Sequence, residues 1–500
     1  MTYAVILSVP RVAPVRPAAA PAIIKSILNQ HGKSSTVIDL NLKYFSDFNQ
    51  QVSPEVFAEI DDHLFLPNRN LGQPAQQCFS KFLQACAEQV LEHKPEKIFL
   101  SVFTWQAQRF TREFLKTLRS QCQAEIIIGG QGLIYAEHGS YSGRPDFAHE
   151  LKDLGLIDHW IRGEAESTIP ELIKGNYNVQ GINTDTMALT TEVSDHAYMD
   201  FSDYQIDQYQ SGFDHGVLPM ESSRGCFRKC VFCDIPTMAG GYRVKQGRKL
   251  ANELIHYYET YGVRNFFFHD ALCNGDIPVF REFNQTLLDY YKQHNLPDRY
   301  LSYSSHAVIH HVKNFTEHDF ELMGRAGADA MAIGVETGSD KVRTAMRKGF
   351  TNRDLDFTLK MYSKYNIKMY LLMIVGFPTE TDEDFQQTLD MLTKYQPYVA
   401  DGTIIGVNFN TTFTVEHGTT IHREYKKFHI KGLNQDQPLG AEWQSLDNPD
   451  LTYKKRIMRR IQAQEHAVNL GYTFWKGDDQ MKILMERYKD RLSRYAGVIH

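Results

Sequence analysis

Short apolar segments alternate with amphipathic segments along most of this chain. In the N-terminal part, strand-like apolar runs cover residues 3–9, 35–42, 97–105, 124–130 and 156–163, and segments of helical periodicity lie between them. Short apolar strands that alternate with helices predict a parallel, doubly wound, Rossmann-like sheet. In such a sheet the ligand-binding edge is formed by the carboxyl ends of the strands.

A second series of strand and helix patterns follows a less patterned linker at about residues 176–215. Six strand candidates begin at Val217, Arg264, Tyr300, Ala330, Lys368 and Gly402. The segments between them, such as LANELIHYYETYG and FREFNQTLLDYYKQH, place apolar residues three and four positions apart. Six units predict a partial β/α barrel, although an open sheet would give the same pattern.

The last 60 or so residues are charged and helical in period, as in TYKKRIMRRIQAQEHAVNL and DQMKILMERYKDRLSRYA. We expect them to form a small helical region that packs against the chain. With 500 residues the chain is too long for one ordinary core. The predicted fold class is α/β, with a Rossmann-like domain over 1–190, a partial (β/α)6 barrel over 191–430 and a helical region over 431–500.

Composition excludes several classes of protein. The chain has 42% hydrophobic and 23% charged residues, which is typical of globular proteins, and its net charge of −6 makes a nucleic-acid partner unexpected. The first residues contain no basic stretch before a short apolar run, so we expect a strand there rather than a signal peptide. No apolar run approaches the length of a membrane span. We therefore expect a cytoplasmic protein.

Three cysteines within eight positions are the strongest chemical signal. The segment RGCFRKCVFCD places Cys226, Cys230 and Cys233 with C-x3-C-x2-C spacing directly after a predicted strand. Three thiolates on one loop can ligate three irons of a 4Fe-4S cluster and leave the fourth iron open to another ligand. A zinc site completed by a histidine such as His215 or His256 is the alternative, and it would indicate a zinc-stabilised binding protein that is not an enzyme.

This loop, after the first strand of a six-unit β/α pattern, resembles the cysteine loop of the radical S-adenosylmethionine (SAM) superfamily. The resemblance implies that the open iron binds the methionine part of SAM. It also implies that one electron from the reduced cluster cleaves SAM to a 5′-deoxyadenosyl radical, which abstracts hydrogen from a substrate. An electron donor such as flavodoxin or ferredoxin is then expected.

Other positions match the SAM-binding pattern of that superfamily. The resemblance assigns the adenine side to Phe232, the amino group of SAM to Asp270, and the ribose or methionine part to Glu336. It also assigns a backbone contact with adenine to Gly376 and Pro378. Asp270 ends FFFHD, where the common Gly-Gly-Glu is missing. Phe232 could instead be a hydrophobic anchor of its loop, and Gly376 and Pro378 could only shape a turn.

The doubly wound domain ahead of the barrel is similar to the cobalamin-binding domain of the cobalamin-dependent subgroup. IIIGGQG and IRGEAESTIPELI in the N-terminal part, with GVETGSD and VGFPTET in the barrel, extend this similarity over about residues 1–410. The expected cobalamin contacts are Ser101, Thr104, Gly129 and Gly130. A segment D-x-H-x-x-G is absent, so a histidine ligand to cobalt is not expected. Alternatively, the domain only braces the barrel.

The first functional hypothesis is a cobalamin-dependent radical enzyme that transfers a methyl group to an unactivated carbon of a small molecule or another substrate. Cobalamin-assisted cyclisation or rearrangement is close to it, and the second hypothesis is a cobalamin-independent radical SAM oxidoreductase, cyclase or isomerase. Methylthiotransferases share the layout but need three cysteines in the N-terminal domain, and Cys78, Cys86 and Cys122 are predicted in helices. Catalytic residues are not assigned, and Tyr303, His306 and Asn408 are candidates for either substrate contact or packing.

Overall fold

The computed structural model describes residues 2–10, 14–65, 69–134, 146–194, 196–209, 212, 214–409, 412–432, 439–440 and 443–474. The chain divides into two compact units, Met1–Pro219 and Met220–His500. Part of the linker belongs to the first unit, because Asp203 pairs with Lys25 at 2.6 Å and accepts from the Val37 N–H at 2.7 Å. The expected boundaries at residues 190 and 430 stay predictions.

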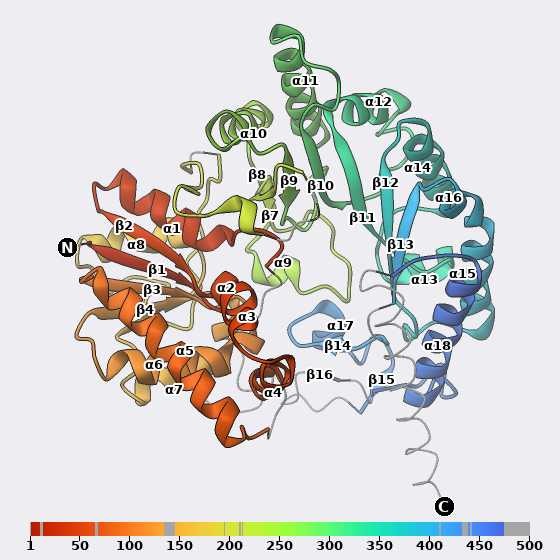
Figure 1. The fold of residues 1–500 in the computed structure, drawn as a ribbon. Helices are drawn as coiled ribbons and strands as arrows, with labels where there is room; N and C mark the ends of the chain where they lie inside the picture. Colours follow the sequence, from red (N-terminus) through yellow and green to blue (C-terminus); the bar gives the residue numbers. More distant parts are fainter. Residues whose placement is uncertain are drawn as a thin grey trace, which may run out of the picture. The chain divides into compact units, whose positions relative to one another are not determined.

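The first unit contains a five-stranded parallel sheet in the order β2-β1-β3-β4-β5 (Figure 1). Its strands are β1 (Ala4–Ser8), β2 (Ser35–Asp39), β3 (Lys97–Ser101), β4 (Glu125–Gly129) and β5 (His159–Ile161). All five strands were predicted, and the doubly wound sheet is confirmed. The strand order reverses between β1 and β3, so the ligand crevice of this fold type lies at the carboxyl ends of these two strands.

Helices cover this sheet and bury its apolar residues. They are α1 (Ala19–Gln30), α2 (Leu40–Lys43), α3 (Asn49–Gln51), α4 (Pro54–Phe65), α5 (Gln73–Glu92), α6 (Gln108–Arg119), α7 (Phe147–Asp153) and α8 (Ala165–Ile173). The second strand is shorter than predicted, because the Asp39 carboxylate accepts from the N–H groups of Asn41 and Leu42 and starts α2. Cys78 and Cys86 lie on α5, and Cys122 follows α6.

The second unit is built on a six-stranded sheet in the order β13-β12-β11-β10-β9-β6, with β9 to β13 parallel. Its strands are β6 (Val217–Met220), β9 (Asn265–Phe268), β10 (Ser302–Ala307), β11 (Ala328–Glu336), β12 (Lys368–Met373) and β13 (Ile404–Asn408). These are the six predicted strands. The partial β/α barrel is therefore confirmed.

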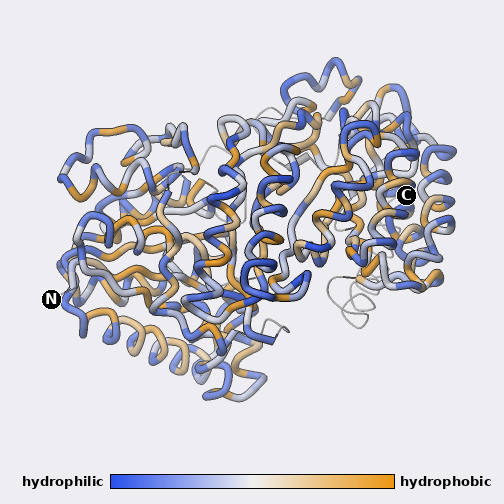
Figure 2. Tube along the Cα trace, turned by 90° about the horizontal axis from the view of Figure 1, so that it is seen from above, coloured by the Kyte–Doolittle hydropathy of each residue, from blue (hydrophilic) through white to orange (hydrophobic). Residues whose placement is uncertain are grey.

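Amphipathic helices pack on the outer side of these strands, and orange and blue residues alternate along them in Figure 2. They are α10 (Gly247–Tyr261), α11 (Ile277–Gln293), α12 (Glu317–Ala326), α13 (Asp340–Ala345), α14 (Asn352–Lys364), α15 (Asp382–Lys394) and α16 (Gln396–Ala400). The short helix α9 (Ile235–Met238) follows the cysteine loop, and the two-residue strands β7 (Ser223–Arg224) and β8 (Arg243–Val244) pair beside it.

The C-terminal region is helical only in part. The helix α18 (Tyr453–Asn469) is present as predicted, but it is preceded by α17 (Thr420–Arg423) and by short strands before and after α17 that pair antiparallel. These are β14 (Val415–Glu416) with β16 (Leu439–Gly440), and β15 (Ile430–Lys431) with β17 (Gln444–Ser445). The helix expected from Asp479 lies outside the described residues. Among the described helices, none combines the length and the apolar character needed to cross a bilayer.

Three helices of the second unit begin with the same reciprocal cap. At Thr316, Thr351 and Thr381 the threonine side chain accepts from the N–H three residues later, and the aspartate there accepts from the threonine N–H. This satisfies two backbone donors that would otherwise lack partners at the start of the helix. The loops that lead from β10, β11 and β12 into α12, α14 and α15 therefore end at defined residues.

We predict that Thr351→Ala lowers the free energy of unfolding of the second unit by about 1 kcal/mol, because α14 loses its cap hydroxyl. The urea midpoint of far-UV circular dichroism measures this change. Thr351→Ser keeps the hydroxyl and should unfold close to the original chain. Equal midpoints for the alanine variant and the original chain would contradict the assigned cap.

Candidate active site

The predicted site residues of the second unit gather at one edge of its sheet. The cysteine loop follows β6 and β7, Asp270 follows β9, Glu336 ends β11, and Gly376 follows β12. Because β9 to β13 are parallel, their carboxyl ends meet at the same edge. Residues more than 100 positions apart in the sequence are thereby brought to one end of the barrel.

The cysteine loop is held by backbone contacts with two other loops. The Arg228 guanidinium donates to the carbonyls of Gly349 and Ile309, each at 2.9 Å. The Val231 N–H donates to the Met346 carbonyl at 3.1 Å. These contacts fix the loop between the segments that follow β10 and α13, so the spacing of its thiols is set by the barrel.

All three thiols of the loop are free and lie inside the protein. Cys230 is buried, and Cys226 and Cys233 are half-buried. Burial raises the pKa of all three, that of Cys233 to about 12, with the neighbouring Asp234 carboxylate adding to the effect at Cys233. Three soft donors on one short loop suit an iron–sulfur cluster, and metal binding would release the thiol protons.

Lys348 is a functional candidate that the sequence pattern did not indicate. Its ammonium group donates to Glu336 at 2.8 Å, lies 6.0 Å from the centre of the Phe232 ring, and interacts electrostatically with Cys230. Burial lowers its pKa, but Glu336 and the thiol loop outweigh this, so its pKa is raised. A buried ammonium thus accompanies the thiols and the strand-end carboxylate.

Glu336 has a backbone conformation that is uncommon for a residue other than glycine. Its φ is +68°, and the pairing of β11 with β12 shifts register just before it. The side chain is buried and occupies the space beside Gly334, where an added Cβ would lie 2.3 Å from Glu336 Oε1 and 2.7 Å from Lys348 Nζ. Such strain at a strand end is typical of functional sites.

Asp270 joins the ends of β6 and β9. It is buried, and its Oδ2 accepts from the Ser222 N–H at 2.7 Å and from the Ser222 hydroxyl. Burial raises the pKa of Asp270 to about 8, although the two hydrogen bonds from Ser222 act against this rise. Asp270 therefore holds the residue that leads into the cysteine loop, and its binding to a SAM amino group stays a prediction.

The structure shows the packing roles that were the alternatives to SAM contact for Phe232, Gly376 and Pro378. Phe232 is half-buried against an apolar cluster around Val231 and Phe377, as expected of a loop anchor. Gly376 has φ +84°, and a Cβ there would meet the Arg456 side chain at 2.6 Å, so packing already requires glycine. Pro378 is buried in the same turn. Their contacts with adenine stay predictions.

Of the three candidates for substrate contact, Tyr303 is in the core. Its hydroxyl donates to Asn284 of α11 at 2.6 Å, and its side chain is fully buried. Of the two roles that the sequence left open for it, Tyr303 has the packing role, because its side chain is on the helix-facing side of β10. His306 alternates with it and is half-buried, and burial lowers the pKa of its imidazole. Asn408 is half-buried at the end of β13.

The expected cobalamin contacts lie at the carboxyl edge of the first sheet. Ser101 ends β3, Gly129 ends β4, and Thr104 lies in the loop after β3. A Cβ at Gly130 would lie 2.3 Å from the Val102 carbonyl oxygen, so loop packing explains this glycine, whereas one at Gly129 would meet only Ile161, at 3.6 Å or more. The Thr104 hydroxyl is buried and has no hydrogen-bond partner among the described residues. Gly129 and Thr104 thus fit a ligand better than Gly130 does.

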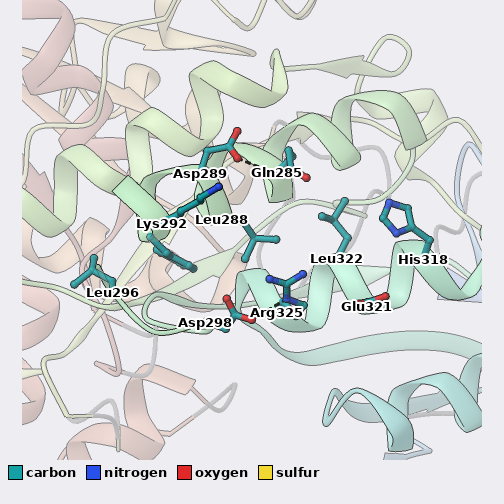
Figure 3. A pocket seen from close by; sticks show the side chains of 11 residues that line it. Gln285, Leu288, Asp289, Lys292, Leu296, Asp298, His318, Glu321, Leu322 and Arg325 are labelled. Atoms are coloured by element: carbon teal, nitrogen blue, oxygen red, sulfur yellow. Dashed lines mark hydrogen bonds and ion pairs between the residues drawn. The ribbon is translucent and has the colours of Figure 1, made fainter. Parts of the chain in front are cut away.

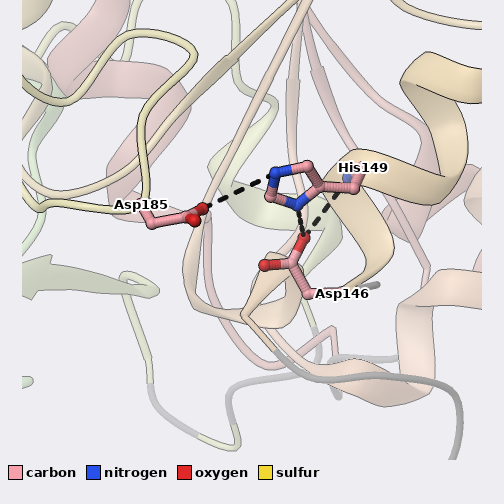
Figure 4. Close-up of side chains that lie close together, drawn as sticks. All are labelled: Asp146, His149 and Asp185. Carbon is pink, nitrogen blue, oxygen red and sulfur yellow. Dashed lines mark hydrogen bonds and ion pairs between the residues drawn. The ribbon is translucent and has the colours of Figure 1, made fainter. Parts of the chain in front are cut away.

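Asp146, His149 and Asp185 lie close together near the end of β5 (Figure 4). His149 contacts Asp146 at 2.9 Å and Asp185 at 3.7 Å, and Arg162 contacts both carboxylates. Arg162 and His149 lower the pKa of Asp146, although its burial acts in the opposite direction. Because both carboxylates already pair with the Arg162 guanidinium, we assign this cluster to structure rather than to metal binding.

One described cavity lies away from this edge of the barrel. A groove of about 410 Å³ between α11 and α12 is lined by residues such as Asp289, Lys292 and Arg325 (Figure 3). An ion pair of 2.7 Å between Arg325 and Asp298 spans part of it. None of the predicted site residues lines this groove, so its volume says nothing about the site at the strand ends.

Comparison with known families identifies the barrel. Residues 220–392 match the model of the radical SAM superfamily, and the expected radical SAM domain is thus confirmed for this segment. The ribosomal protein uS12 methylthiotransferase RimO of Hydrogenobaculum sp. is 28% identical over 183 residues, which are 35% of this chain and 43% of that protein. The anaerobic magnesium-protoporphyrin IX monomethyl ester cyclase of Synechocystis sp. is 22% identical over 286 residues, 54% of each chain. The chain spans about half the length of these curated relatives.

Solved structures share the fold over most of the chain. The radical SAM methyltransferase TsrM from Kitasatospora setae, determined with cobalamin and a [4Fe-4S] cluster, gives a TM-score of 0.61 at 15% identity, over 91% of this chain and 85% of that one. The cobalamin-dependent radical enzyme OxsB gives a TM-score of 0.62 at 15% identity, over 93% of this chain and 66% of that one. The fold expected from the cobalamin-dependent subgroup is therefore confirmed.

We predict that the stability difference between the original chain and Asp270→Asn depends on pH. The pKa of Asp270 is about 8 in the folded protein and near 3.8 in the unfolded chain. The protonated carboxyl therefore contributes its full share of the protein's stability below pH 4, and this contribution is lost as the pH rises towards 8. The melting temperature of the original chain should therefore fall relative to Asp270→Asn between pH 5 and 8.

Asp384→Asn is the matched control for this measurement. The pKa of Asp384 is lowered to about 2, against its burial, by Lys341 and by hydrogen bonds at the start of α15, so its contribution is constant between pH 5 and 8. A difference for Asp270→Asn that is equally flat over this range would contradict the raised pKa.

Proposed function

We propose that this chain, in which residues 220–392 are a radical SAM domain, is an enzyme that cleaves SAM reductively and transfers a methyl group to an unactivated carbon with the help of cobalamin. The observation that supports this most directly is the loop of Cys226, Cys230 and Cys233, which offers three free thiols at a barrel edge with a buried lysine and a strained carboxylate. The substrate is a small molecule or another compound whose identity the site does not specify.

The donor set of this loop fits a 4Fe-4S cluster better than a zinc ion. Three thiols share one loop, and among the described residues no histidine hydrogen-bonds to any of them. A bound cluster would supply the single electron that breaks a carbon–sulfur bond of SAM. The surrounding residues would hold the thiolates at fixed spacing, and the Lys348 ammonium would compensate part of their negative charge.

The strand-end residues fit a bound SAM molecule. Glu336 presents a buried carboxylate at the end of β11, and its Oε1 is already paired with Lys348 at 2.8 Å. The Thr379 hydroxyl in the turn after β12 is buried without a hydrogen-bond partner among the described residues. Unsatisfied buried polar atoms are costly, so a ligand that bonds to this hydroxyl would recover that cost. Phe232, Gly376 and Pro378 would then border the adenine.

The first unit fits a corrinoid at the edge where Ser101, Thr104 and Gly129 lie. In sheets with this strand order a ligand is expected at the ends of β1 and β3. The exposed Phe103 side chain lies in the loop that follows β3. An exposed phenylalanine and an unpartnered threonine hydroxyl are what a large ligand with an apolar macrocycle and polar side arms would cover. Bound cobalamin would serve as the carrier of a methyl group that comes from SAM.

Two neighbouring reaction types remain distinguishable from this proposal. The methylthiotransferase relatives would, by the family resemblance, require a second cluster on three N-terminal cysteines, but Cys78 and Cys86 lie along one helix, α5. The cyclase relative favours ring formation as the second candidate function. SAM labelled in its methyl carbon separates methyl transfer from ring formation, because ring formation leaves the label out of the product. Methylthio transfer would also carry the label, but the mass of its product would show an added sulfur atom.

A cytoplasmic location and a one-electron donor protein, such as flavodoxin or ferredoxin, complete the proposal. The cluster must be reduced before each cleavage, and a low-potential donor is the chemical class that can do this. We also propose that the enzyme acts without nucleic acid, in keeping with the net charge of −6.

We predict that Cys226→Ala, Cys230→Ala and Cys233→Ala each abolish formation of 5′-deoxyadenosine from SAM under dithionite, because each removes a cluster ligand. The measurement is product quantification after anaerobic reconstitution. Cys78→Ala, which removes a half-buried thiol on α5, is the control and should retain activity. A Cys230→Ala variant that still forms deoxyadenosine would refute the ligand assignment.

We predict that Gly129→Leu lowers the affinity for cobalamin by about tenfold or more, equivalent to about 1.4 kcal/mol, because the side chain would enter the space proposed for the ligand. The apo-protein should remain folded, since a Cβ at this position is 3.6 Å from Ile161. Absorption titration with cobalamin measures the affinity, and thermal unfolding checks the fold.

Gly130→Ala is the contrasting variant. Its Cβ would overlap the Val102 carbonyl and its φ of +112° disfavours alanine, so we expect loss of stability without cobalamin present. Unchanged cobalamin binding by a folded Gly129→Leu variant would place the ligand elsewhere.

A further inference from the structure

The C-terminal helix α18 places arginines inside the protein. Arg456, Arg459 and Arg460 are between 0% and 7% exposed, whereas Lys454 on the same helix is exposed. Burying a guanidinium is unfavourable unless its donors are satisfied. The partners of these arginines therefore show which segments the helix stabilises. Those of Arg456 and Arg459 lie around the turn that follows β12.

Arg459 connects α18 to the backbone of that turn through Glu380. Its guanidinium donates to Glu380 Oε1 at 2.7 Å and to the Glu380 carbonyl at 3.1 Å, and both side chains are at most 4% exposed. The same carboxylate accepts from the Gly376 N–H, with both oxygens within 3.2 Å. Burial raises the pKa of Glu380 to about 7, while Arg459 acts against this rise.

Arg456 holds the other side of the same turn. Its guanidinium lies 3.8 Å from the centre of the Trp443 ring and donates to the carbonyls of Trp443 and Phe413 at 3.2 and 3.3 Å. The aliphatic part of Arg456 fills the space where Gly376 would carry a Cβ. Phe413 in turn donates its N–H to the Val375 carbonyl at 2.9 Å. The turn is thus enclosed by contacts that lead back to one helix.

The enclosed turn still has an unused polar group. Thr379, between Pro378 and Glu380, has a buried hydroxyl without a hydrogen-bond partner among the described residues. Asn448 donates to the Glu380 carbonyl at 2.8 Å, so the backbone around this threonine is held from several directions. A turn that is fixed this tightly and yet leaves a buried hydroxyl unsatisfied is prepared for a ligand.

We propose that Arg459 and Arg456 of α18 are positioning residues of the SAM site, which set the backbone from Gly376 to Glu380 so that Thr379 and the Gly376 region can bind SAM. This inference rests on the proposed function, because it takes SAM as the ligand of the turn. It gives the C-terminal helix a role in cofactor affinity that its amphipathic pattern does not show.

The choice of charged side chains supports a positioning role over simple packing. Apolar residues of similar volume usually stabilise a core as well as a buried ion pair does, or better. The ion pair instead gives a directed contact, in which one carboxylate is shared by a guanidinium of α18 and by the Gly376 N–H. Loss of Arg459 would leave that carboxylate buried and uncompensated and free to rotate away from Gly376.

The test is SAM affinity, measured by anaerobic equilibrium dialysis of the reconstituted protein without a reductant. We expect Arg459→Met to weaken SAM binding about tenfold, equivalent to about 1.4 kcal/mol, while the iron content stays unchanged. Lys454→Met, on the exposed face of α18, is the matched control and should bind SAM as the original chain does. Arg459→Lys keeps the charge and should lose less affinity.

A second variant separates positioning from stability. Arg459→Met combined with Glu380→Met removes both buried charges, so the fold should be as stable as that of the original chain, as thermal unfolding will show. The Gly376 N–H then has no carboxylate partner, and SAM binding should remain weakened. If this folded double variant, or folded Arg459→Met, binds SAM as tightly as the original chain, the inference is overturned.

Binding by the original chain distinguishes failure of the proposed function from failure of the role of α18. If the original chain itself binds iron but no SAM, the assignment of SAM as the ligand falls, irrespective of the variants. If the original chain binds SAM, and both Arg459→Met and the double variant with Glu380→Met bind it equally well, only the role of α18 falls.

Discussion

The parallel alignment of β9 to β13 is the constraint on which the site depends. It brings the carboxyl ends of these strands to one edge, beside the loop that follows β6. A cysteine loop alone could hold a metal, but only this edge adds the carboxylate of Glu336, the turn at Gly376 and the tie between Asp270 and Ser222. The chemistry proposed here requires all of these groups at one place.

Buried charged pairs then fix the loops that leave this edge. Lys348 pairs with Glu336 beside the thiols, and Arg459 pairs with Glu380 beside the turn after β12. Each pair joins two segments that are not adjacent in the sequence. Because an unpaired buried charge is costly, each pair favours one arrangement of its loop over others. The site is thereby held in shape before any ligand binds.

The sequence predicted the strands well, because apolar runs of four to nine residues are bounded by turns and alternate regularly with helices. All five strands of the first sheet and all six of the second were anticipated. The cysteine ligands were also predictable, since their spacing within one loop is itself the signal. Glu336 could be located because a carboxylate ends an apolar strand.

Other features depend on contacts that periodicity does not encode. Lys348 lies in an irregular segment after α13, and nothing in its neighbourhood distinguishes it from a surface lysine. Arg456 and Arg459 look like the solvent face of a charged helix, yet they are buried against Trp443 and Glu380. The sequence left open whether Tyr303 packs or contacts substrate, because a one-residue change along a strand reverses the face on which a side chain lies. Gly376 and Gly130 match ligand patterns but are required by packing.

The most direct test of the central claim is electron paramagnetic resonance of the anaerobically reconstituted, dithionite-reduced chain, recorded with and without SAM and together with metal analysis. The account predicts about four irons per chain and a cluster signal that changes when SAM is added, because SAM would bind the open iron. Zinc at one equivalent without iron, or a cluster signal that SAM leaves unchanged, would contradict it.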